Sequence, residues 1–363
     1  MNTAAAVAPQ DLDWFSTHAE ALDRGTASAD ALLGELSRRG LLHIGVPAGQ
    51  GGAGGTVADA AEAVARVAER SLAAALVFWG HRTLIECLLQ SPNADLRARW
   101  LPSLLAGELA GASGLSNAMK YLADIESLRI TASAHGDRWR LHGRVPWATN
   151  LRPGGFVVAV AVDGADGGAP PKVVALTDEL PGIHRSEDLD LIALRGTHTA
   201  RIDIDRAEVG AADVIHDDAR AFCPRLRPAF LSLQLGLSIG LARASLEQAR
   251  SLSRQGPGDV ESRVDALWME SHALALSLRE GLQDGRFVAQ AQSLFRIRIR
   301  YAEIVQAALN LELEAAGGQA YLVSPVQGFA RRWREAAFIP VITPSLAQLR
   351  FELRRAGGPA PAA

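Results

Sequence analysis

Three glycines near the N-terminus have a spacing that could hold a phosphate group. Gly49, Gly51 and Gly54 satisfy the pattern G-x-G-x-x-G after a short apolar stretch. In a dinucleotide-binding turn, such glycines let the backbone approach a diphosphate at the start of a helix. Pro47 interrupts that approach, and the acidic residue expected about 20 positions later falls in a helical pattern near Glu69. The sequence therefore favours a structural glycine-rich turn between helices, with a Rossmann-type site as the weaker alternative.

The other chemically capable residues are isolated in the sequence. Cys87 and Cys223, the two cysteines, lie far apart and form no Cys/His cluster, so neither a disulfide framework nor a metal site is predicted. His81 lies in an apolar helical pattern and is a candidate catalytic residue, although a packed histidine is the more common case. His198 is expected to form hydrogen bonds within a loop.

Hydrophobic spacing divides the chain into three parts. Apolar residues recur at helical spacing through the first third, and long helical patterns return in the last third. The middle third has short alternating or apolar runs separated by Gly, Pro and Asp, which predict antiparallel strands. The pattern is typical of an α+β fold. We expect an N-terminal helical domain (residues 1–111), a central antiparallel, barrel-like β domain (112–218) and a C-terminal four-helix bundle (219–363).

The charge balance excludes some classes of protein. The chain has 37 Lys and Arg residues against 40 Asp and Glu, a formal net charge of −3, without the clustered basic residues that a nucleic-acid binder needs for phosphate contacts. Arg296, Arg298 and Arg300 lie two apart, so they spread over different helix faces and are expected to be solvated. The first residues lack the basic start and apolar run of a signal peptide, which favours a cytoplasmic protein without a membrane segment. The strongly apolar C-terminal helices predict a homo-oligomer.

Five short motifs, in order along the chain, resemble the acyl-CoA dehydrogenase family. They are GLLHIGVP with GGAGG at residues 40–55, RWLPSLLAGE at 99–108, LHGRVPWATN at 141–150, LRGTHT at 194–199, and GG followed by Tyr at 317–321. Each motif is weak alone, but their order and spacing are similar to those of the family. The resemblance implies the same helix, strand, helix plan, a flavin cofactor, and an acyl thioester or other carrier-linked acyl substrate.

The resemblance also implies which residues contact the flavin. A flavin ring is flat, with apolar faces and a polar rim, so its site needs an aromatic face and a few placed hydrogen-bonding groups. Trp147 and Thr149, two apart on a predicted strand, share one side of the sheet and meet both needs. In the family, the corresponding residues cover the ring and bond near N5, and Ser116 stands where the family has a threonine at the pyrimidine edge. A core tryptophan beside a strand threonine is the plainer alternative.

The adenosine half of the cofactor is less well matched. Gly317 and Gly318 stand where the family's backbone approaches the cofactor, which favours FAD. The family also has an arginine followed by Phe-Gly that reaches the adenosine half across a subunit interface. Residues 250–258 lack the Phe-Gly pair, and Arg254 is the candidate substitute for that arginine. FMN therefore remains an alternative to FAD.

The resemblance does not supply a catalytic base. Proton removal α to a thioester, with hydride transfer to N5, needs a carboxylate within hydrogen-bond reach. Thr343 occupies the position of the family's usual glutamate, and the alternative position falls near Phe230. Three hypotheses follow: an acyl-type dehydrogenase with an electron-transfer partner, a flavin-dependent monooxygenase of the same fold served by a flavin reductase, or a catalytically silent flavoprotein subunit. The stretch GRVPWAT at 143–149 is also similar to the monooxygenase branch.

Overall fold

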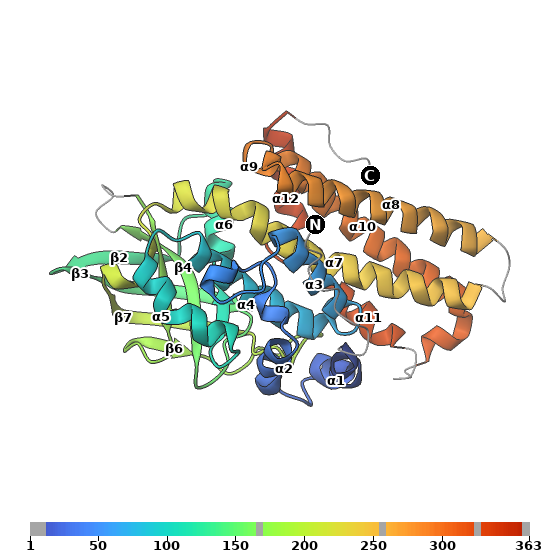
Figure 1. Ribbon diagram of the computed structural model, residues 1–363, viewed down its shortest axis with the longest axis horizontal. Coiled ribbons are helices and arrows are strands. Elements are labelled where there is room, and N and C mark those ends of the chain that lie inside the picture. Colours follow the sequence, from blue (N-terminus) through green and yellow to red (C-terminus); the bar gives the residue numbers. More distant parts are fainter. Residues whose placement is uncertain (1–11, 165–169, 254–258, 323–327, 358–363) are drawn as a thin grey trace.

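The computed structural model describes residues 12–164, 170–253, 259–322 and 328–357. Figure 1 shows the strands at one end of the molecule, the long helices α8 and α10 at the other, and α7 running between them. The helical N-terminal part, central sheet and helical C-terminal part confirm the expected fold class.

Three of the N-terminal helices, α3, α4 and α5, begin at side-chain caps. Thr56 and Asp59 form a capping box at the start of α3, and the Ser71 and Asn93 side chains accept backbone N–H bonds that start α4 and α5. Helix α4 is buried on all sides, which explains its continuously apolar sequence. The helices are α1 (Asp13–Arg24), α2 (Leu32–Arg38), α3 (Val57–Ala68), α4 (Leu72–Leu89) and α5 (Ala94–Leu105), with 3₁₀ turns at Ala29–Ala31, Leu41–His43 and Ala48–Gln50.

The glycine triplet at 49, 51 and 54 lies in a compact turn before α3. Val46 and Gly54 form an isolated bridge across it. A Cβ on Gly52 would lie 2.1 Å from the Val46 carbonyl oxygen, so only glycine fits there. The turn follows a 3₁₀ segment instead of the strand that a Rossmann-type site requires. The three glycines therefore belong to a structural turn between helices.

The central sheet is mixed, which corrects the expectation of an antiparallel domain. Its order is β6-β7-β3-β2-β4-β5-β8, with β1 beside β4. Strand β4 runs parallel to β1 and to β2, because helix α6 (Ser116–Leu122) and the β2–β3 hairpin provide the long connections that parallel neighbours need. The strands are β1 (Ala110–Ser113), β2 (Ile130–His135), β3 (Arg138–Ala148), β4 (Phe156–Gly164), β5 (Lys172–Thr177), β6 (Ile183–Arg185), β7 (Ala200–Val209) and β8 (Val214–His216).

The C-terminal part contains the long helices α7, α8 and α10 and the shorter α12. Helix α7 packs against α3, α8 and α10. A Cβ on Gly236 or Gly240 of α7 would lie 2.6 or 2.1 Å from a carbonyl oxygen of α3, so these glycines let the two helices approach closely. The helices are α7 (Ala219–Ser253), α8 (Asp259–Gln283), α9 (Arg286–Ala289), α10 (Ala291–Ala316), α11 (Phe329–Ala336) and α12 (Leu346–Arg355), with a 3₁₀ segment at Gly317–Tyr321.

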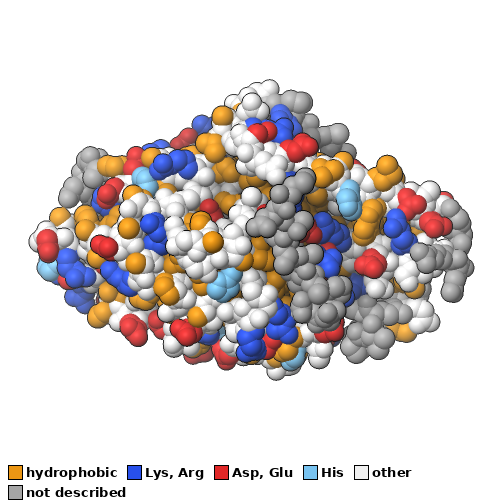
Figure 2. All heavy atoms as spheres, in the orientation of Figure 1, with side chains coloured by type: hydrophobic (Ala, Val, Ile, Leu, Met, Phe, Trp, Pro, Cys, Tyr) orange, Lys and Arg blue, Asp and Glu red, His pale blue; other side chains and the backbone are white. Residues whose placement is uncertain are grey.

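Among the residues that the structure describes, two helices are long and apolar enough to cross a membrane by length and composition alone. They are α4 and α7, and 94% and 89% of their apolar windows are buried inside the molecule. Packing in the interior therefore accounts for their composition. On the face drawn in Figure 2, basic and acidic side chains are interspersed and do not gather by sign.

Candidate functional site

A cavity of about 270 Å³ lies where the sheet meets both groups of helices. Most of its lining is apolar, as expected for a small-molecule site with a few placed polar groups. Helix α4 contributes Leu76 and Trp79 to its walls, and the sheet region contributes Ser113 of β1, Ser116 of α6, Trp147 of β3 and Thr149 just after β3. The remaining lining consists of residues 190–194, Thr199, Arg334, Ala337, Phe338 and residues 341–343.

Trp147 and Thr149 line the same cavity, as predicted, although Thr149 lies one residue beyond the end of β3. The Trp147 side chain is 40% exposed despite its size, and its ring centroid lies 6.3 Å from that of Phe338 in an edge-on arrangement. An aromatic face is therefore available to a flat ligand at the cavity wall.

A chain of threonine hydroxyls fixes the proton on Thr149. The Thr197 hydroxyl donates to the Leu194 carbonyl oxygen at 2.7 Å. Because a hydroxyl has one proton, Thr199 then donates to Thr197 at 2.8 Å, and Thr149 donates to Thr199 at 3.0 Å. Thr149 thus remains free to accept a hydrogen bond from another group at the cavity.

Ser113 supplies an unsatisfied polar atom to the cavity. Its Oγ is buried and has no hydrogen-bond partner among the described residues, although Ser113 lies in the lining. A buried hydroxyl without a partner costs about 1–3 kcal/mol, a cost that a polar ligand atom would remove. The half-exposed indole, the accepting hydroxyl and this free hydroxyl together suit the flat, polar-rimmed ring of a flavin.

One wall of the cavity, residues 337–343, is held from behind by a buried arginine. Arg298 Nη2 donates to the Ile339 carbonyl oxygen at 2.6 Å, and its Nε donates to Gln234 Oε1 at 2.9 Å. The Gln234 amide in turn donates to the Thr343 carbonyl oxygen at 2.9 Å. Arg298 is 0% exposed, which corrects the expectation that it is solvated, and burial lowers its pKa to about 10.

A second wall of the cavity, residues 190–194, is bound to the end of α1. Asp23 Oδ1 accepts the Leu194 N–H at 2.9 Å, and its Oδ2 accepts Arg334 Nη2 at 2.7 Å. The Gly196 N–H donates to the Leu22 carbonyl oxygen, and a Cβ on Gly196 would lie 2.4 Å from the Ala27 carbonyl oxygen. The LRG motif at 194–196 therefore docks this wall on the N-terminal helices.

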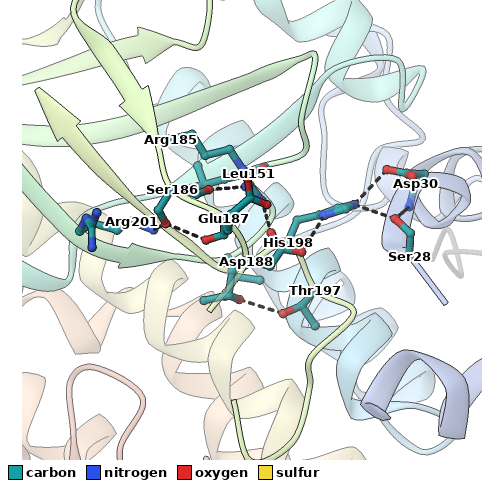
Figure 3. A network of polar contacts seen from close by, with 12 residues as sticks. Ser28, Asp30, Leu151, Arg185, Ser186, Glu187, Asp188, Thr197, His198 and Arg201 are labelled. Atoms are coloured by element: carbon teal, nitrogen blue, oxygen red, sulfur yellow. Dashed lines mark hydrogen bonds and ion pairs between the residues drawn. The ribbon is translucent and has the colours of Figure 1, made fainter. Parts of the chain in front are cut away.

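His198 adds a second fastening to the same wall, shown in Figure 3. Its Nε2 lies 2.9 Å from Asp30 Oδ1 and 3.0 Å from Ser28 Oγ, and its Nδ1 lies 3.3 Å from Asp188 Oδ2. The hydrogen bond from Ser28 is the main cause that lowers the pKa of Asp30, with His198 adding to it. His198 thus forms loop hydrogen bonds, as the sequence suggested, and links the 186–199 segment to the residues after α1.

His81 lies outside the cavity lining and is occupied by backbone partners. Its Nε2 lies 2.9 Å from the Leu104 carbonyl oxygen, and its Nδ1 accepts the Gly111 N–H at 2.9 Å. Burial lowers its pKa to about 4, so the ring is neutral at neutral pH. Both ring nitrogens are used in joining α4 to β1 and α5, which gives His81 a structural role.

The described lining offers little for acid-base chemistry. Thr343 lies in the cavity wall, at the position where the sequence resemblance placed the family's glutamate. Among the described residues of the lining, the carboxylate is Asp190, whose side chain is 85% exposed and paired with Arg195. No group of three or more His, Cys, Asp or Glu in the described ranges is arranged to hold a metal ion.

The residues expected at the adenosine half of the cofactor do not join this cavity. Gly317 and Gly318 are exposed in the 3₁₀ segment that ends α10, and they do not line the cavity. Arg254 lies outside the described residues. Their role toward a cofactor stays a prediction.

Three contributors to the site were missed from the sequence. Ser113 lies in a run of small residues, and Asp23 lies near the end of an ordinary amphipathic helix, so neither had a distinguishing signal. Arg298 did have one, because Leu294, Tyr301 and Val305 stand four before, three after and seven after it and place it on an apolar helix face. A cation inside such a face is uncommon.

Comparison with known proteins connects this geometry to one family. Residues 5–108 match the model of the acyl-CoA dehydrogenase N-terminal domain. A probable acyl-CoA dehydrogenase of Bacillus subtilis (strain 168) is 22% identical over 346 residues, 90% of this chain and 89% of that protein. The mitochondrial isovaleryl-CoA dehydrogenase of Bos taurus is 28% identical over 185 residues, 50% of this chain and 43% of that protein. The family model, the curated relatives and the solved structures all indicate the acyl-CoA dehydrogenase family. The match with the bovine enzyme thus spans less than half of that enzyme's length.

Solved structures of the acyl-CoA dehydrogenase fold cover nearly the whole chain. Butyryl-CoA dehydrogenase of Megasphaera elsdenii has a TM-score of 0.78 at 17% identity and covers 98% of this chain and 100% of that chain. KijD3, solved in complex with FMN and a dTDP-linked amino sugar, has a TM-score of 0.78 at 19% identity and covers 96% and 91%. The family is a flavoprotein family, and the fold expected from the sequence is confirmed.

Proposed function

We propose that this chain is a flavin-dependent oxidoreductase that binds the flavin ring against Trp147 and an acyl-type substrate in the apolar remainder of the cavity. The observation that carries the proposal is the cavity of about 270 Å³ in which a half-exposed indole, the Thr149 hydroxyl and the unpartnered Ser113 hydroxyl meet. Such a combination of one aromatic face and a few polar atoms is typical of cofactor sites.

The residues of the chain would bind and orient the flavin ring and shield the reacting atoms from water. A bound flavin supplies two-electron chemistry by carrying a hydride at N5. The Trp147 face would orient the ring, and Thr149, left as an acceptor by Thr199, suits an N–H on the ring edge. Phe338, Leu76 and the wall at residues 341–343 would exclude water from the reacting atoms.

The reaction itself has two candidates. The family resemblance favours oxidation of an acyl thioester with electrons passed to a partner. The lining supports a second candidate, a flavin-dependent monooxygenase, because Thr343 replaces the expected glutamate and the Asp190 carboxylate is largely in solvent. Oxidation at the β carbon without a positioned base lacks a route for the α proton.

The test is to purify the protein and identify the flavin that it carries or takes up. We expect a yellow protein that binds FAD or FMN with a visible absorption spectrum perturbed from that of free flavin. Bleaching by an acyl-CoA without oxygen would support the dehydrogenase. Bleaching only by NADH with a reductase, followed by substrate-dependent oxygen uptake, would support the monooxygenase. A colourless protein that binds neither flavin would overturn the proposal.

A gain-of-function variant separates the two reactions further. Thr343→Glu places a carboxylate at the cavity wall where the family's base is expected. If the missing base limits thioester oxidation, this variant gains anaerobic bleaching by acyl-CoA, whereas the matched variant Thr343→Gln does not. Equal rates in both variants would contradict the role assigned to the missing carboxylate.

A further inference from the structure

Arg298 is a buried cation that no carboxylate neutralises among the residues that the structure describes. It is 0% exposed, and its hydrogen-bond partners, the Ile339 carbonyl oxygen and the Gln234 amide oxygen, are neutral. Its Nη1 is buried without a partner. Although burial lowers its pKa to about 10, the guanidinium stays protonated at neutral pH. Arg298 therefore carries a full positive charge into the interior.

Three other arginines are buried in the described parts of the chain, and each of them pairs with a carboxylate. The pairs are Arg82 with Glu86 at 2.9 Å, Arg331 with Glu335 at 2.8 Å, and Arg332 with Glu312. A buried cation without such a partner is costly. A negative charge brought near Arg298 would lower this cost, so Arg298 favours anions in its surroundings.

Arg298 lies behind the wall of the main cavity at residues 337–343. Gln234 accepts the Arg298 Nε–H at 2.9 Å and donates to the Thr343 carbonyl oxygen at 2.9 Å, and Thr343 lines the cavity. Arg298 itself donates to the Ile339 carbonyl oxygen in the same wall. Since Arg298 and Gln234 are 0% and 1% exposed, solvent and salt screen this charge little. The charge therefore acts on a ligand in the cavity.

The charged residues of the cavity lining do not cancel the charge of Arg298. Among the described lining residues, these are Asp190 and Arg334. The Asp190 side chain is 85% exposed, so its charge is screened by solvent. Arg334 is offset by two carboxylates, Asp23 at 2.7 Å and Glu20 at 3.1 Å. The uncompensated charge beside the cavity is thus that of Arg298.

We propose that Arg298 is a positioning residue that makes the main cavity favour the negatively charged state of the ligand it binds. Arg298 does not line the cavity, so it acts through the wall at residues 337–343. The inference rests on the proposed function, because the flavin ring is taken as that ligand.

The redox chemistry of a flavin makes this preference measurable. When a hydride from an acyl-type substrate, or from NADH through a reductase, is transferred, its C–H bond breaks and an N5–H bond forms. Both electrons enter the ring, which gains one negative charge near N1 without taking up a further proton. A cation beside the ring stabilises this charge and raises the midpoint potential of the flavin.

The test neutralises Arg298 while leaving it in place. Gln234→Glu puts a carboxylate beside Arg298 Nε, whereas the matched variant Gln234→Met removes the same hydrogen bonds and adds no charge. The flavin-loaded proteins are titrated with sulfite, which adds to N5 with the same gain of negative charge, and their midpoint potentials are measured against a reference dye. We expect Gln234→Glu to bind sulfite about tenfold more weakly and to have a two-electron potential about 30 mV lower, with Gln234→Met close to wild type.

Two variants of Arg298 give an independent check. Arg298→Lys keeps the charge and should stay close to wild type, whereas Arg298→Met removes it and should lower the potential as Gln234→Glu does. Equal potentials and sulfite affinities in wild type and Gln234→Glu would overturn the inference. An equal loss in Gln234→Met would also overturn it, because the effect would then come from the shape of the wall. Either result would leave flavin binding and the proposed function standing, whereas a wild-type protein that binds no flavin would overturn both.

Discussion

Two walls of the main cavity are held in place by different kinds of contact. The wall at residues 337–343 depends on Arg298 and Gln234, which are 0% and 1% exposed and bind backbone carbonyl oxygens or each other. The wall at residues 190–194 depends on Asp23 and His198, which are 1% and 7% exposed but bind partners in contact with solvent. The side chains of these partners, Arg334 and Asp30, are 27% and 68% exposed. Buried contacts are screened little by salt, whereas exposed pairs are worth little and are screened strongly.

The two kinds of contact predict that the two walls differ in how far their geometry depends on pH. The first wall carries Thr343 and Phe338, and its titratable partner Arg298, with a pKa lowered to about 10, stays charged at acid and neutral pH, so this wall should keep one geometry there. The second wall responds to the ionisation of Asp30, whose pKa is lowered by Ser28 and His198, and it can loosen without loss of the core. The comparison therefore predicts a graded set of responses to substitution, pH and salt.

The largest effect is expected for Arg298→Ala. The substitution leaves a void and removes the partners of Gln234 and Ile339, which should lower the free energy of unfolding by about 3 kcal/mol or more. Arg298→Met fills the space and removes the buried charge, so it should cost about half as much or less. Urea unfolding measures both, with the exposed Arg296→Ala on the same helix as control. A loss no larger than that of the control would contradict the buried fastening.

The sequence predicted the cavity residues Trp147 and Thr149, but it did not predict the contacts of Arg298 and Asp23 that hold the cavity walls. Trp147 and Thr149 could be predicted because residues two apart on a strand share a face whatever the tertiary structure. The partners of Arg298 could not be predicted. Helical spacing shows that Arg298 lies on a different face from Arg296 and Arg300, but it does not show which residues that face contacts. Asp23 binds residues far along the chain at 194 and 334, and local patterning carries no signal for such pairs.

More of the fold than of the candidate site could be predicted from the sequence. Helical and strand periodicity gave the three parts, and α7 begins at Ala219, where the C-terminal part was expected to start. Periodicity does not give strand direction, so the parallel neighbours of β4 were missed. The expected cofactor contacts of Gly317 and Gly318 are not part of the cavity within this one chain.

The next effect concerns the buried His81. His81 has a pKa lowered from 6.5 to about 4 by burial, so the unfolded chain binds a proton that the folded protein resists. The contribution to stability is complete above pH 6.5 and is lost as the pH falls toward 4, by about 3 kcal/mol in total. His81→Asn should flatten this part of the pH profile of unfolding. An unchanged slope in the variant would show that other groups cause it.

A smaller loss of stability is expected when Asp23, which binds the wall at residues 190–194, is substituted. Asp23→Ala leaves the Leu194 N–H and the Arg334 guanidinium without this acceptor and should cost about 2 kcal/mol. Asp23→Asn keeps the acceptor for Leu194 and should cost less. Thermal unfolding compares the two variants, and limited proteolysis near residues 190–195 reports the loosening. Equal losses in both variants would locate the effect in the Arg334 ion pair alone.

The smallest effect belongs to His198. His198→Ala should lower the free energy of unfolding by less than about 1 kcal/mol, and the difference from wild type should shrink in high salt. The lowered pKa of Asp30 means that its part of the contact is present above pH 3.8 and is lost as the pH falls through the folded value. Unfolding at two salt concentrations measures the difference. A large, salt-independent loss would place His198 with the buried fastenings instead.

The central claim, that a flavin ring lies against Trp147, is tested most directly by equilibrium binding of FMN to Trp147→Ala. Trp333→Ala is the matched control, since Trp333 is 44% exposed on α11 and outside the cavity lining. We predict that Trp147→Ala weakens FMN binding about tenfold or more and shifts the visible spectrum of the bound flavin, while Trp333→Ala changes neither. Equal affinity and an identical spectrum in wild type and Trp147→Ala would contradict the claim.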